Sequence, residues 1–344
     1  MYDALILGGG AAGLSAAVAL GRAGRRVLVL DAGSPRNRFA SHMHTVLGHE
    51  GTDPVELLAR GRAEARRYGV EIVPGWAVTL REVRGAGSGA DDGGPRRDEH
   101  AERAVTDGAL EDGPLLELST SEGAVVVGRA ALLATGLTDR LPEVPGLAER
   151  WGRSVLHCPY CHGWEVRGRR LGVLVTGPVG FHQAQLIRQW SEFVTVFAHG
   201  HEVPDDVARR LRSRGVEIVP GEVLELLGEG PDVTAVRTAD GALTEIDAIF
   251  TASTLEPNDA CCAPLGLERA ELPMGMGSFV AVDATGRTSH ERVWAAGNVI
   301  NPALGVAASM GAGTQVGGAI NMALITAEFD RAELERAELE RADA

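Results

Sequence analysis

The sequence predicts an α/β protein built on dinucleotide-binding frames, and three observations lead to that prediction. A glycine-rich turn at residues 8–13 directly follows a short apolar strand. A Cys-Pro-Tyr-Cys pair stands at residues 158–161. A second strand, turn and helix begin near residue 171, with altered residues in the turn. Such frames are typical of proteins that bind nucleotides at the carboxyl ends of parallel strands.

Length and composition limit the possible functions. With 344 residues, 44% of them hydrophobic and 23% charged, the chain is long enough for two cores. No apolar run is long enough for a membrane span, and the N-terminus lacks the basic region of a signal peptide, so we expect a cytoplasmic protein. There, a CxxC pair is more often catalytic or metal-binding than structural. The net charge of −14 argues against nucleic acid or an anionic membrane as a partner.

The first frame is complete. Residues 4–7 and 27–30 are predicted strands, and residues 14–23 between them form an Ala- and Leu-rich helix. Gly8 allows the tight turn, Gly10 lets the backbone approach a pyrophosphate, and Gly13 lets helix and strand pack closely. Asp31 ends the second strand, where an acid accepts the ribose hydroxyls. The residues predicted to bind an adenine dinucleotide here are Gly8, Gly10, Ala12, Gly13, Asp31 and Ala32.

Two further segments indicate which dinucleotide is bound. A buried strand at residues 130–134 runs into Thr135-Gly136, and residues 292–298 read Arg-Val-Trp-Ala-Ala-Gly-Asn. At these segments the chain resembles the low-molecular-weight thioredoxin reductases, which carry two dinucleotide-binding domains. The resemblance implies FAD as cofactor, with Thr135, Gly136, Gly297 and Asn298 at its site. Asn298 stands where the family usually has Asp, but an amide still donates and accepts hydrogen bonds.

The same resemblance implies the domain layout. A split FAD domain would comprise residues 1–142 and 248–330, and a smaller α/β domain would occupy residues 143–247. The resemblance also implies a homodimer. Residues 85–113 are poor in large apolar side chains and are predicted to form a flexible surface hairpin or loop, with a functional lid as the alternative. Residues 331–344 are expected to form a polar, solvated helical tail.

The CxxC pair is predicted to be redox-active. Pro159 suits the first turn of a helix, which places Cys158 near a helix N-terminus and lowers its thiol pKa. The resemblance implies that Cys161 lies against the flavin and that Cys158 attacks a substrate sulfur. Zinc is the alternative, but the other cysteines are adjacent at positions 261 and 262, without zinc-site spacing, so no metal is expected. We expect Cys261 and Cys262 to be a free, non-catalytic pair in a loop.

His162 follows the pair where thioredoxin reductases usually carry an acid. Imidazole titrates near neutral pH, so we expect His162 to take protons from incoming thiols; a capping or packing role is the alternative. The aromatic residues Tyr160, Trp164, Phe181 and Trp190 lie near these positions in the sequence. They are expected to pack in the core, and the alternative is a pocket for a small planar substrate.

The second frame looks damaged. Its predicted strand covers residues 171–175 and its helix residues 183–190, and we assign Val179 and His182 to the middle and third glycine positions. Those side chains would block the pyrophosphate and close helix packing. Residues 198–201, Ala-His-Gly-His, offer neither an acid for a ribose nor an arginine pair for a 2′-phosphate. The sequence therefore predicts loss of the nicotinamide site.

These features set the expected function. The run from Cys158 to Glu165, the weak second frame and His42-Met43-His44-Thr45 resemble the thioredoxin-reductase-like dithiol oxidases that close the disulfides of holomycin, gliotoxin and romidepsin. The resemblance implies a small-molecule dithiol and dioxygen as partners, with hydrogen peroxide as a product. The alternatives are an NADPH-dependent reductase, a ferredoxin-linked reductase and a non-enzymatic flavin sensor.

Overall fold

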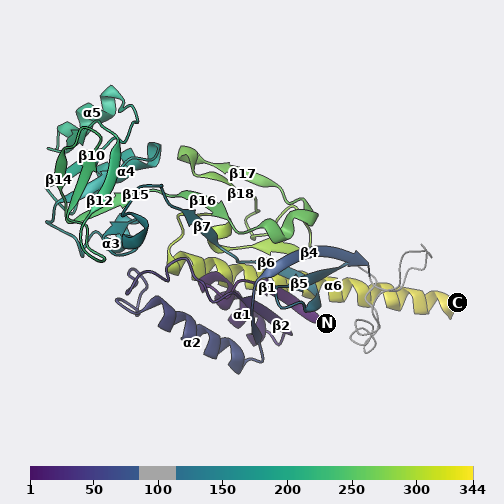
Figure 1. The fold of residues 1–344 in the computed structure, drawn as a ribbon. Helices are drawn as coiled ribbons and strands as arrows, with labels where there is room; N and C mark the ends of the chain where they lie inside the picture. The colour runs from purple at the N-terminus through teal and green to yellow at the C-terminus, as the bar shows by residue number, and fades with distance from the viewer. Residues whose placement is uncertain (85–113, 344) are drawn as a thin grey trace.

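Two sheets with helices organise the chain, in agreement with the predicted α/β class (Figure 1). The structure is a computed structural model that describes residues 1–84 and 114–343. The hairpin expected at residues 85–113 lies outside the described residues. Among the residues that are described, no helix is both long and apolar enough to cross a bilayer.

The larger sheet is built around the first frame. In spatial order its strands are β3 (Glu71–Pro74), β2 (Val27–Asp31), β1 (Tyr2–Leu7), β6 (Val125–Leu133), β5 (Pro114–Thr120) and β4 (Ala77–Arg84), and β19 (Val293–Ala295) also pairs with β6. The pairs of β1 with β2 and with β6 are parallel. Since β19 joins β6 in parallel, a late segment of the chain returns to the sheet that the N-terminus begins.

Both faces of this sheet are buried. Ala4 and Ile6 of β1 face one apolar cluster, whereas Leu5 and Leu7 face another, as the alternation of a strand requires. The first face is covered by α1 (Ala11–Arg22) together with α6 (Val306–Ala342) and α2 (Pro54–Arg67). A Cβ on Gly313 of α6 would lie 2.0 Å from the Ala12 carbonyl oxygen, so only glycine permits this close approach of α6 to α1.

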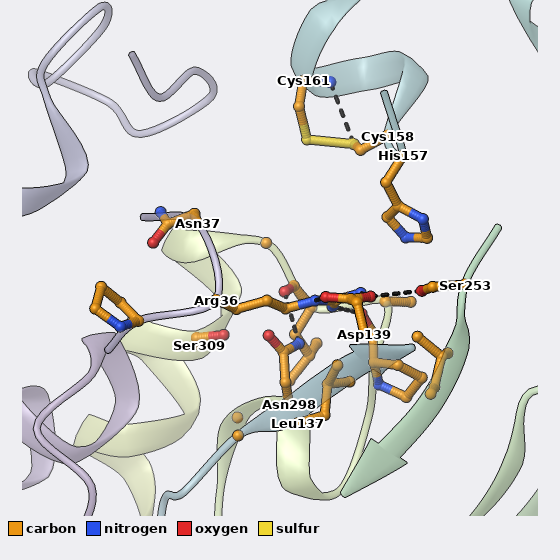
Figure 2. A pocket seen from close by; sticks show the side chains of 18 of the residues that line it. Arg36, Asn37, Leu137, Asp139, His157, Cys158, Cys161, Ser253, Asn298 and Ser309 are labelled. Atoms are coloured by element: carbon orange, nitrogen blue, oxygen red, sulfur yellow. Dashed lines mark hydrogen bonds and ion pairs between the residues drawn. A yellow bond between two sulfur atoms is a disulfide. The ribbon is translucent and has the colours of Figure 1, made fainter. Parts of the chain in front are cut away.

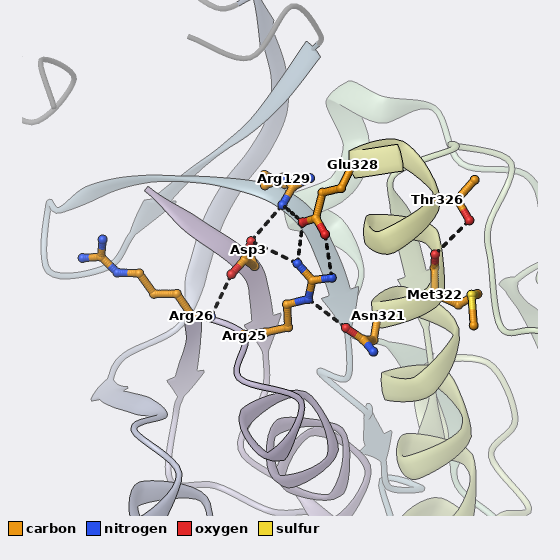
Figure 3. A network of polar contacts seen from close by, with 8 residues as sticks. All are labelled: Asp3, Arg25, Arg26, Arg129, Asn321, Met322, Thr326 and Glu328. Atoms are coloured by element: carbon orange, nitrogen blue, oxygen red, sulfur yellow. Dashed lines mark hydrogen bonds and ion pairs between the residues drawn. The ribbon is translucent and has the colours of Figure 1, made fainter. Parts of the chain in front are cut away.

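A polar network fastens α6 to the sheet (Figure 3). Arg25 and Arg129 both donate to Glu328 of α6, at 2.5 and 2.6 Å. Arg129 also donates to Asp3, and Arg25 to Asn321. The hydrogen bond from Arg25, followed by that from Arg129, lowers the pKa of Glu328 to about 2 against the opposing effect of burial.

Beyond this network α6 is solvated, as predicted for the part of the 331–344 tail that the structure describes. Leu334 and Leu339 are 67% and 68% exposed. The helical tail is not a separate element, because α6 continues without a break from Val306 to Ala342.

The smaller sheet carries the second frame. Its order is β11 (Glu217–Val219), β10 (Val194–Phe197), β9 (Leu171–Leu174), β15 (Ala248–Thr251) and β8 (Val155–Leu156), all in parallel. Helices α4 (Pro178–Ile187) and α5 (Asp205–Arg212) belong to this part, and β12 (Val223–Leu227), β13 (Ala235–Thr238) and β14 (Leu243–Glu245) form a three-stranded sheet beside it.

An antiparallel ribbon of β7 (Leu137–Arg140) and β16 (Thr254–Pro257) carries the chain between the two sheets. The expected boundary at residue 248 lies too early, because β15 is an interior strand of the smaller sheet. Its residues are buried on both faces, a pattern that suits either sheet and gives no boundary signal. The remaining elements are α3 (Pro159–His162), β17 (Arg269–Leu272), β18 (Gly277–Val280) and the short 3₁₀ turns η2 (Ala148–Arg150), η3 (Ala260–Leu265), η4 (Pro273–Gly275) and η5 (Gly297–Val299).

Candidate active site

One cavity of about 960 Å³ collects almost every predicted site residue. Its walls include Gly8, Gly10, Ala12, Asp31, Ala32, Thr135, Gly136, Cys158, Cys161, His162, Gly297 and Asn298. Gly13 is the exception and lies behind the wall, where a Cβ would be 1.9 Å from the Gly8 carbonyl oxygen. The cavity therefore joins the first frame, the dithiol and the chain segment before α6, three regions far apart in the sequence.

The first frame presents a bare helix N-terminus to this cavity. Gly8 has φ +116°, and a Cβ there would lie 2.3 Å from the Ala134 carbonyl oxygen, so the turn requires glycine. Gly10 is the N-cap of α1, with no side-chain cap and no atom within 4 Å of where its Cβ would stand. The first N–H groups of α1 are thus available to an anion such as a pyrophosphate.

Further polar groups on the cavity wall fit an adenine dinucleotide. Thr135 Oγ1 is buried and has no hydrogen-bond partner, which marks a position where a ligand atom is needed. Asp31 accepts from the Gly33 N–H and from Arg62, both at 2.8 Å, so its carboxylate is held at the end of β2. The Asn298 amide donates to the carbonyls of Asn301 and Leu304, which leaves its oxygen as an acceptor.

The cysteines form a disulfide on the cavity wall (Figure 2). Cys158 is the N-cap of α3 and Pro159 its first residue, as predicted, and the two cysteine Cα atoms are 5.2 Å apart. The Cys161 N–H donates to Cys158 Sγ at 3.2 Å, so the helix end stabilises negative charge on that sulfur. Among the described residues no group of three or more His, Cys, Asp or Glu side chains is arranged to hold a metal ion.

His157 lies between the disulfide and the ion pair of Arg36 with Asp139, which the sequence did not predict (Figure 2). Arg36 donates to both carboxylate oxygens of Asp139 at 2.8 Å, and Ser253 donates to Asp139 at 2.6 Å. Burial opposes ionisation of Asp139, but these hydrogen bonds outweigh it and lower its pKa. Burial, and then Arg36, lower the pKa of His157, whose Nδ1 has no partner. No spacing rule joins Arg36 to Asp139 across 103 residues.

His162 also lines the cavity. Burial lowers its pKa, Glu165 opposes that shift, and His44 reinforces it. A neutral imidazole beside the disulfide is able to accept a proton from a thiol. Its assignment as a base stays a prediction, as does the division of roles between Cys158 and Cys161.

The structure corrects the register of the second frame. Helix α4 begins at Pro178, five residues before the expected start, and its N-cap is Gly177. Gly177 therefore corresponds to Gly10, and Gly180, the third residue of α4, corresponds to Gly13. A Cβ on Gly180 would lie 3.0 Å from Val175 Cα, so Gly180 provides the close packing of helix on strand.

The assignment of Val179 and His182 to the glycine positions was therefore wrong. His182 is exposed and does not separate α4 from its sheet. In the corrected register the second frame has Val175 for Gly8, Thr176 for Gly9, Pro178 for Ala11 and Val179 for Ala12. Proline at the Ala11 position removes an N–H that could have faced a phosphate.

The predictions for the aromatic residues also need correction. Tyr160 and Trp164 are 69% and 64% exposed, so neither is a core residue. Trp190 packs edge-on against Tyr160, and Phe181 is partly buried. None of the four lines this cavity, and their alternative role in a pocket for a planar substrate stays a prediction.

Cys261 and Cys262 are a free pair, as predicted, with sulfurs 3.8 Å apart. They lie in η3 rather than in a loop and are buried in the apolar cluster of the larger sheet. Because they are outside the cavity wall, the geometry gives them a packing role.

A disulfide and a dinucleotide-binding frame meet in one cavity, an arrangement that fits an oxidoreductase of the flavin type. The chain belongs to the pyridine nucleotide-disulphide oxidoreductase family, because the sequence pattern of that family matches residues 2–313. It is an FAD-binding flavoprotein, as members of that family are.

Similar proteins support the thioredoxin-reductase-like resemblance. Thioredoxin reductase sirT of Leptosphaeria maculans is 30% identical over 344 residues, covering 95% of this chain and 96% of its own. Thioredoxin reductase tcpT of Claviceps purpurea is 31% identical over 286 residues, 78% of each chain. The crystal structure of HlmI superposes with a TM-score of 0.86 at 36% identity, covering 98% of this chain and 97% of that chain.

Proposed function

We propose that this flavoprotein is a dithiol oxidase that forms an intramolecular disulfide in a small sulfur-containing secondary metabolite, of the dithiolopyrrolone or epidithio type. One observation carries the proposal: the Cys158–Cys161 disulfide, followed directly by His162, lines the same cavity as the residues that fit the dinucleotide. Two observations support the substrate class: the resemblance of residues 158–165 and 42–45 to the dithiol oxidases of the holomycin, gliotoxin and romidepsin type, and the 36% identity to HlmI over 98% of this chain.

The proposed reaction is two thiol–disulfide exchanges. A substrate thiol gives its proton to His162, and the resulting thiolate attacks Cys158 Sγ. A mixed disulfide forms, the Cys158–Cys161 bond breaks, and Cys161 leaves as a thiolate. The second substrate thiolate then attacks the substrate sulfur of the mixed disulfide and releases Cys158. The substrate is oxidised by two electrons and loses two protons, and the cysteine pair is reduced.

FAD, held by the residues named below, would supply the two-electron chemistry that reoxidises the cysteine pair, and dioxygen is the proposed final acceptor, which two electrons and two protons convert to hydrogen peroxide. The chain's own contribution is to hold the components together. Gly8, Gly10 and the N-terminus of α1 would bind the pyrophosphate, and Asp31 the ribose. Thr135 and Asn298 would contact the rest of the cofactor. The position of Cys158 at the N-terminus of α3 favours its thiolate after reduction.

The direction of electron flow is inferred from the second frame. Val175 stands where the first frame has Gly8, and Pro178 has no N–H to donate to a phosphate. The segment after β10 contains no acidic residue before Glu202 that could bind a ribose. A reduced affinity for NADPH follows from both changes. Electrons from a substrate dithiol then need an acceptor other than nicotinamide, and dioxygen is the proposed one.

The second candidate is an NADPH-dependent disulfide reductase. It is favoured by Gly177 and Gly180, which keep two of the three glycine positions of a nucleotide frame. Such an enzyme would run the same cysteine pair in the opposite direction.

An anaerobic reduction experiment separates the candidates. The FAD-loaded protein is mixed with NADPH or with a small dithiol such as dithiothreitol, and flavin absorbance is followed. We expect rapid bleaching by the dithiol, none by NADPH, and peroxide release when air is admitted. Rapid bleaching by NADPH would support the reductase instead. Bleaching by dithiol without peroxide in air would point to a redox sensor. Cys158→Ser should abolish bleaching by the dithiol while retaining the flavin.

Assembly and location are part of the proposal. We expect a homodimer and a cytoplasmic protein, in which the buried Cys261–Cys262 pair stays reduced. Light scattering of the FAD-loaded protein would measure the first. Expression in the native cell with localisation by fractionation would test the second.

A further inference from the structure

His44 connects the loop after β2 to the segment that carries the dithiol. Its Nδ1 lies 2.5 Å from a carboxylate oxygen of Glu50 in the same loop. Its Nε2 lies 3.5 Å from a carboxylate oxygen of Glu165, three residues after His162. His44 and His162 both line the cavity beside the disulfide. One imidazole is therefore held between two carboxylates at the edge of the redox site.

The loop holds His44 in this position at a conformational cost. Thr45 has φ +61°, a left-handed conformation that is unfavourable for a β-branched residue. Its N–H donates to the second oxygen of Glu50 at 3.1 Å, so one carboxylate holds both His44 and the strained residue. Met43 is buried and exchanges backbone hydrogen bonds with Gly51 and Thr52. The loop is thus anchored on both sides of the strained position.

Two titratable groups act on His162: Glu165 from its own segment and His44 from the loop after β2. His157, in the segment before Cys158, is itself affected by His162. Glu165 alone would favour the imidazolium form of His162, because an opposite charge stabilises a cation. His44 faces the same carboxylate, with its Nε2 3.5 Å from Glu165, and opposes this effect on His162. The two histidines therefore compete for Glu165.

We propose that His44 is a positioning residue that shares the Glu165 carboxylate and thereby keeps His162 neutral beside the disulfide. The inference rests on the proposed function, because a neutral His162 is the form that takes the proton when a substrate S–H bond breaks. In that step the electron pair stays on sulfur and no electron leaves the substrate. Glu50 would act by keeping the His44 ring in place.

Opposite substitutions give opposite expectations. In His44→Gln, Glu165 is left unshared, so the His162 imidazolium gains stability and its titration moves to higher pH. In Glu165→Gln, that stabilisation is lost and the titration moves to lower pH. In the double variant His44→Gln/Glu165→Gln, the His162 titration should lie no higher in pH than in Glu165→Gln alone. The direct effects of each substitution are thus separated from their coupling.

The test is histidine NMR on the oxidised, FAD-loaded protein, with the His162 signal assigned by its loss in His162→Gln. His201→Gln, an exposed histidine outside the cavity wall, is the control and should leave the titration unchanged. Flavin content and melting temperature verify that each variant folds. An unchanged His162 titration in His44→Gln, or shifts of the same sign in both single variants, would overturn the inference.

A kinetic readout tests the link to turnover. The rate of anaerobic flavin reduction by dithiothreitol is measured against pH for the same variants. Below the inflection of the profile, a displacement by one pH unit changes the rate about tenfold, so His44→Gln should lose rate at the acidic end. If the NMR shifts appear but dithiothreitol does not reduce the wild-type flavin, the proposed function fails and the pairing of His44 with Glu165 stands. If dithiothreitol reduces the flavin but no variant moves the titration, the inference fails alone.

Discussion

The two nucleotide-type frames share a backbone plan but differ in what they offer a ligand. In each, a parallel strand is followed by a helix whose N-cap is glycine and whose third residue is glycine, Gly10 and Gly13 in one and Gly177 and Gly180 in the other. The first frame adds Gly8 at φ +116°, and its second strand ends on Asp31. The glycines needed for packing therefore persist in a frame whose ligand-binding residues have changed.

This difference teaches that packing and recognition are separable within one motif. Gly13 and Gly180 touch the preceding turn or strand, whereas Gly10 and Gly177 have open space beside them. Loss of the packing glycine would disturb the sheet. Replacement of a recognition residue, such as Ala11 by proline at the matching position, leaves the fold unchanged.

The largest expected effect comes from replacing Gly8 of the first frame by valine, the residue type that the second frame has at the matching position, Val175. Gly8→Val places a β-branched side chain at φ +116° and 2.3 Å from the Ala134 carbonyl oxygen, so the turn must distort. We expect FAD affinity to fall by more than about 100-fold, given a strain of a few kcal/mol. The measurement is the flavin content of the purified protein. Val175→Gly, the reverse exchange, is the control and should retain FAD.

Asp31→Asn removes the negative charge that ends β2. It weakens the hydrogen bond from Arg62 and any bond to the ribose, so FAD affinity should fall about 10- to 100-fold, as expected for loss of a charged hydrogen bond. Equilibrium dialysis against FAD measures the change. Glu202→Gln, just after the matching segment of the second frame, should leave FAD affinity as it is. Equal loss in both variants would contradict a special role for Asp31.

Pro178→Ala restores an N–H at the start of α4. If the missing donor limits nucleotide binding by the second frame, NADPH affinity should rise about 2- to 10-fold, the worth of one hydrogen bond. Isothermal titration with NADPH provides the measurement. A much larger gain, accompanied by NADPH-dependent flavin bleaching, would show that proline alone separates the two frames.

The smallest effect concerns the support of the first frame by α6. The folded-state pKa of Glu328, about 2, lies below the ordinary value of 4.5, so its ion pairs stabilise the fold above pH 4.5 and this contribution is lost as pH falls toward 2. Because the side chain is 37% exposed, solvent screening limits the contribution to about 1 kcal/mol. Glu328→Gln should lower the free energy of unfolding by that amount at pH 7. The difference from wild type should shrink with acidification, as urea titrations would measure.

Local rules predicted the first frame and the dithiol well. The order of strand, glycines, helix and acid depends on neighbouring residues, and proline at the first helical position placed Cys158 at a helix N-terminus. The same proline rule, applied to Pro178, places the start of α4, whereas spacing from Gly177 alone assigns Val179 and His182 to glycine positions.

Long-range contacts were beyond such rules. Arg36 contacts Asp139, and His44 contacts Glu165, because the fold brings segments that are far apart in the sequence to the same cavity. Charged residues of this kind are frequent along the sequence, and periodicity does not distinguish a partner from a solvated side chain. The one sequence signal was His42-Met43-His44-Thr45, which pointed to the loop but not to its partner.

The β7–β16 ribbon joins the two sheets and also carries residues of the cavity wall. Asp139 on β7 accepts from Ser253, which directly precedes β16, and Asp139 also holds Arg36 from the larger sheet's side of the cavity. A rotation of one sheet against the other would bend this ribbon and move the same residues that surround His157. A ligand that contacts residues from both sides of the cavity would bind one relative orientation of the two sheets more tightly than others, so we expect ligand binding and that orientation to be coupled.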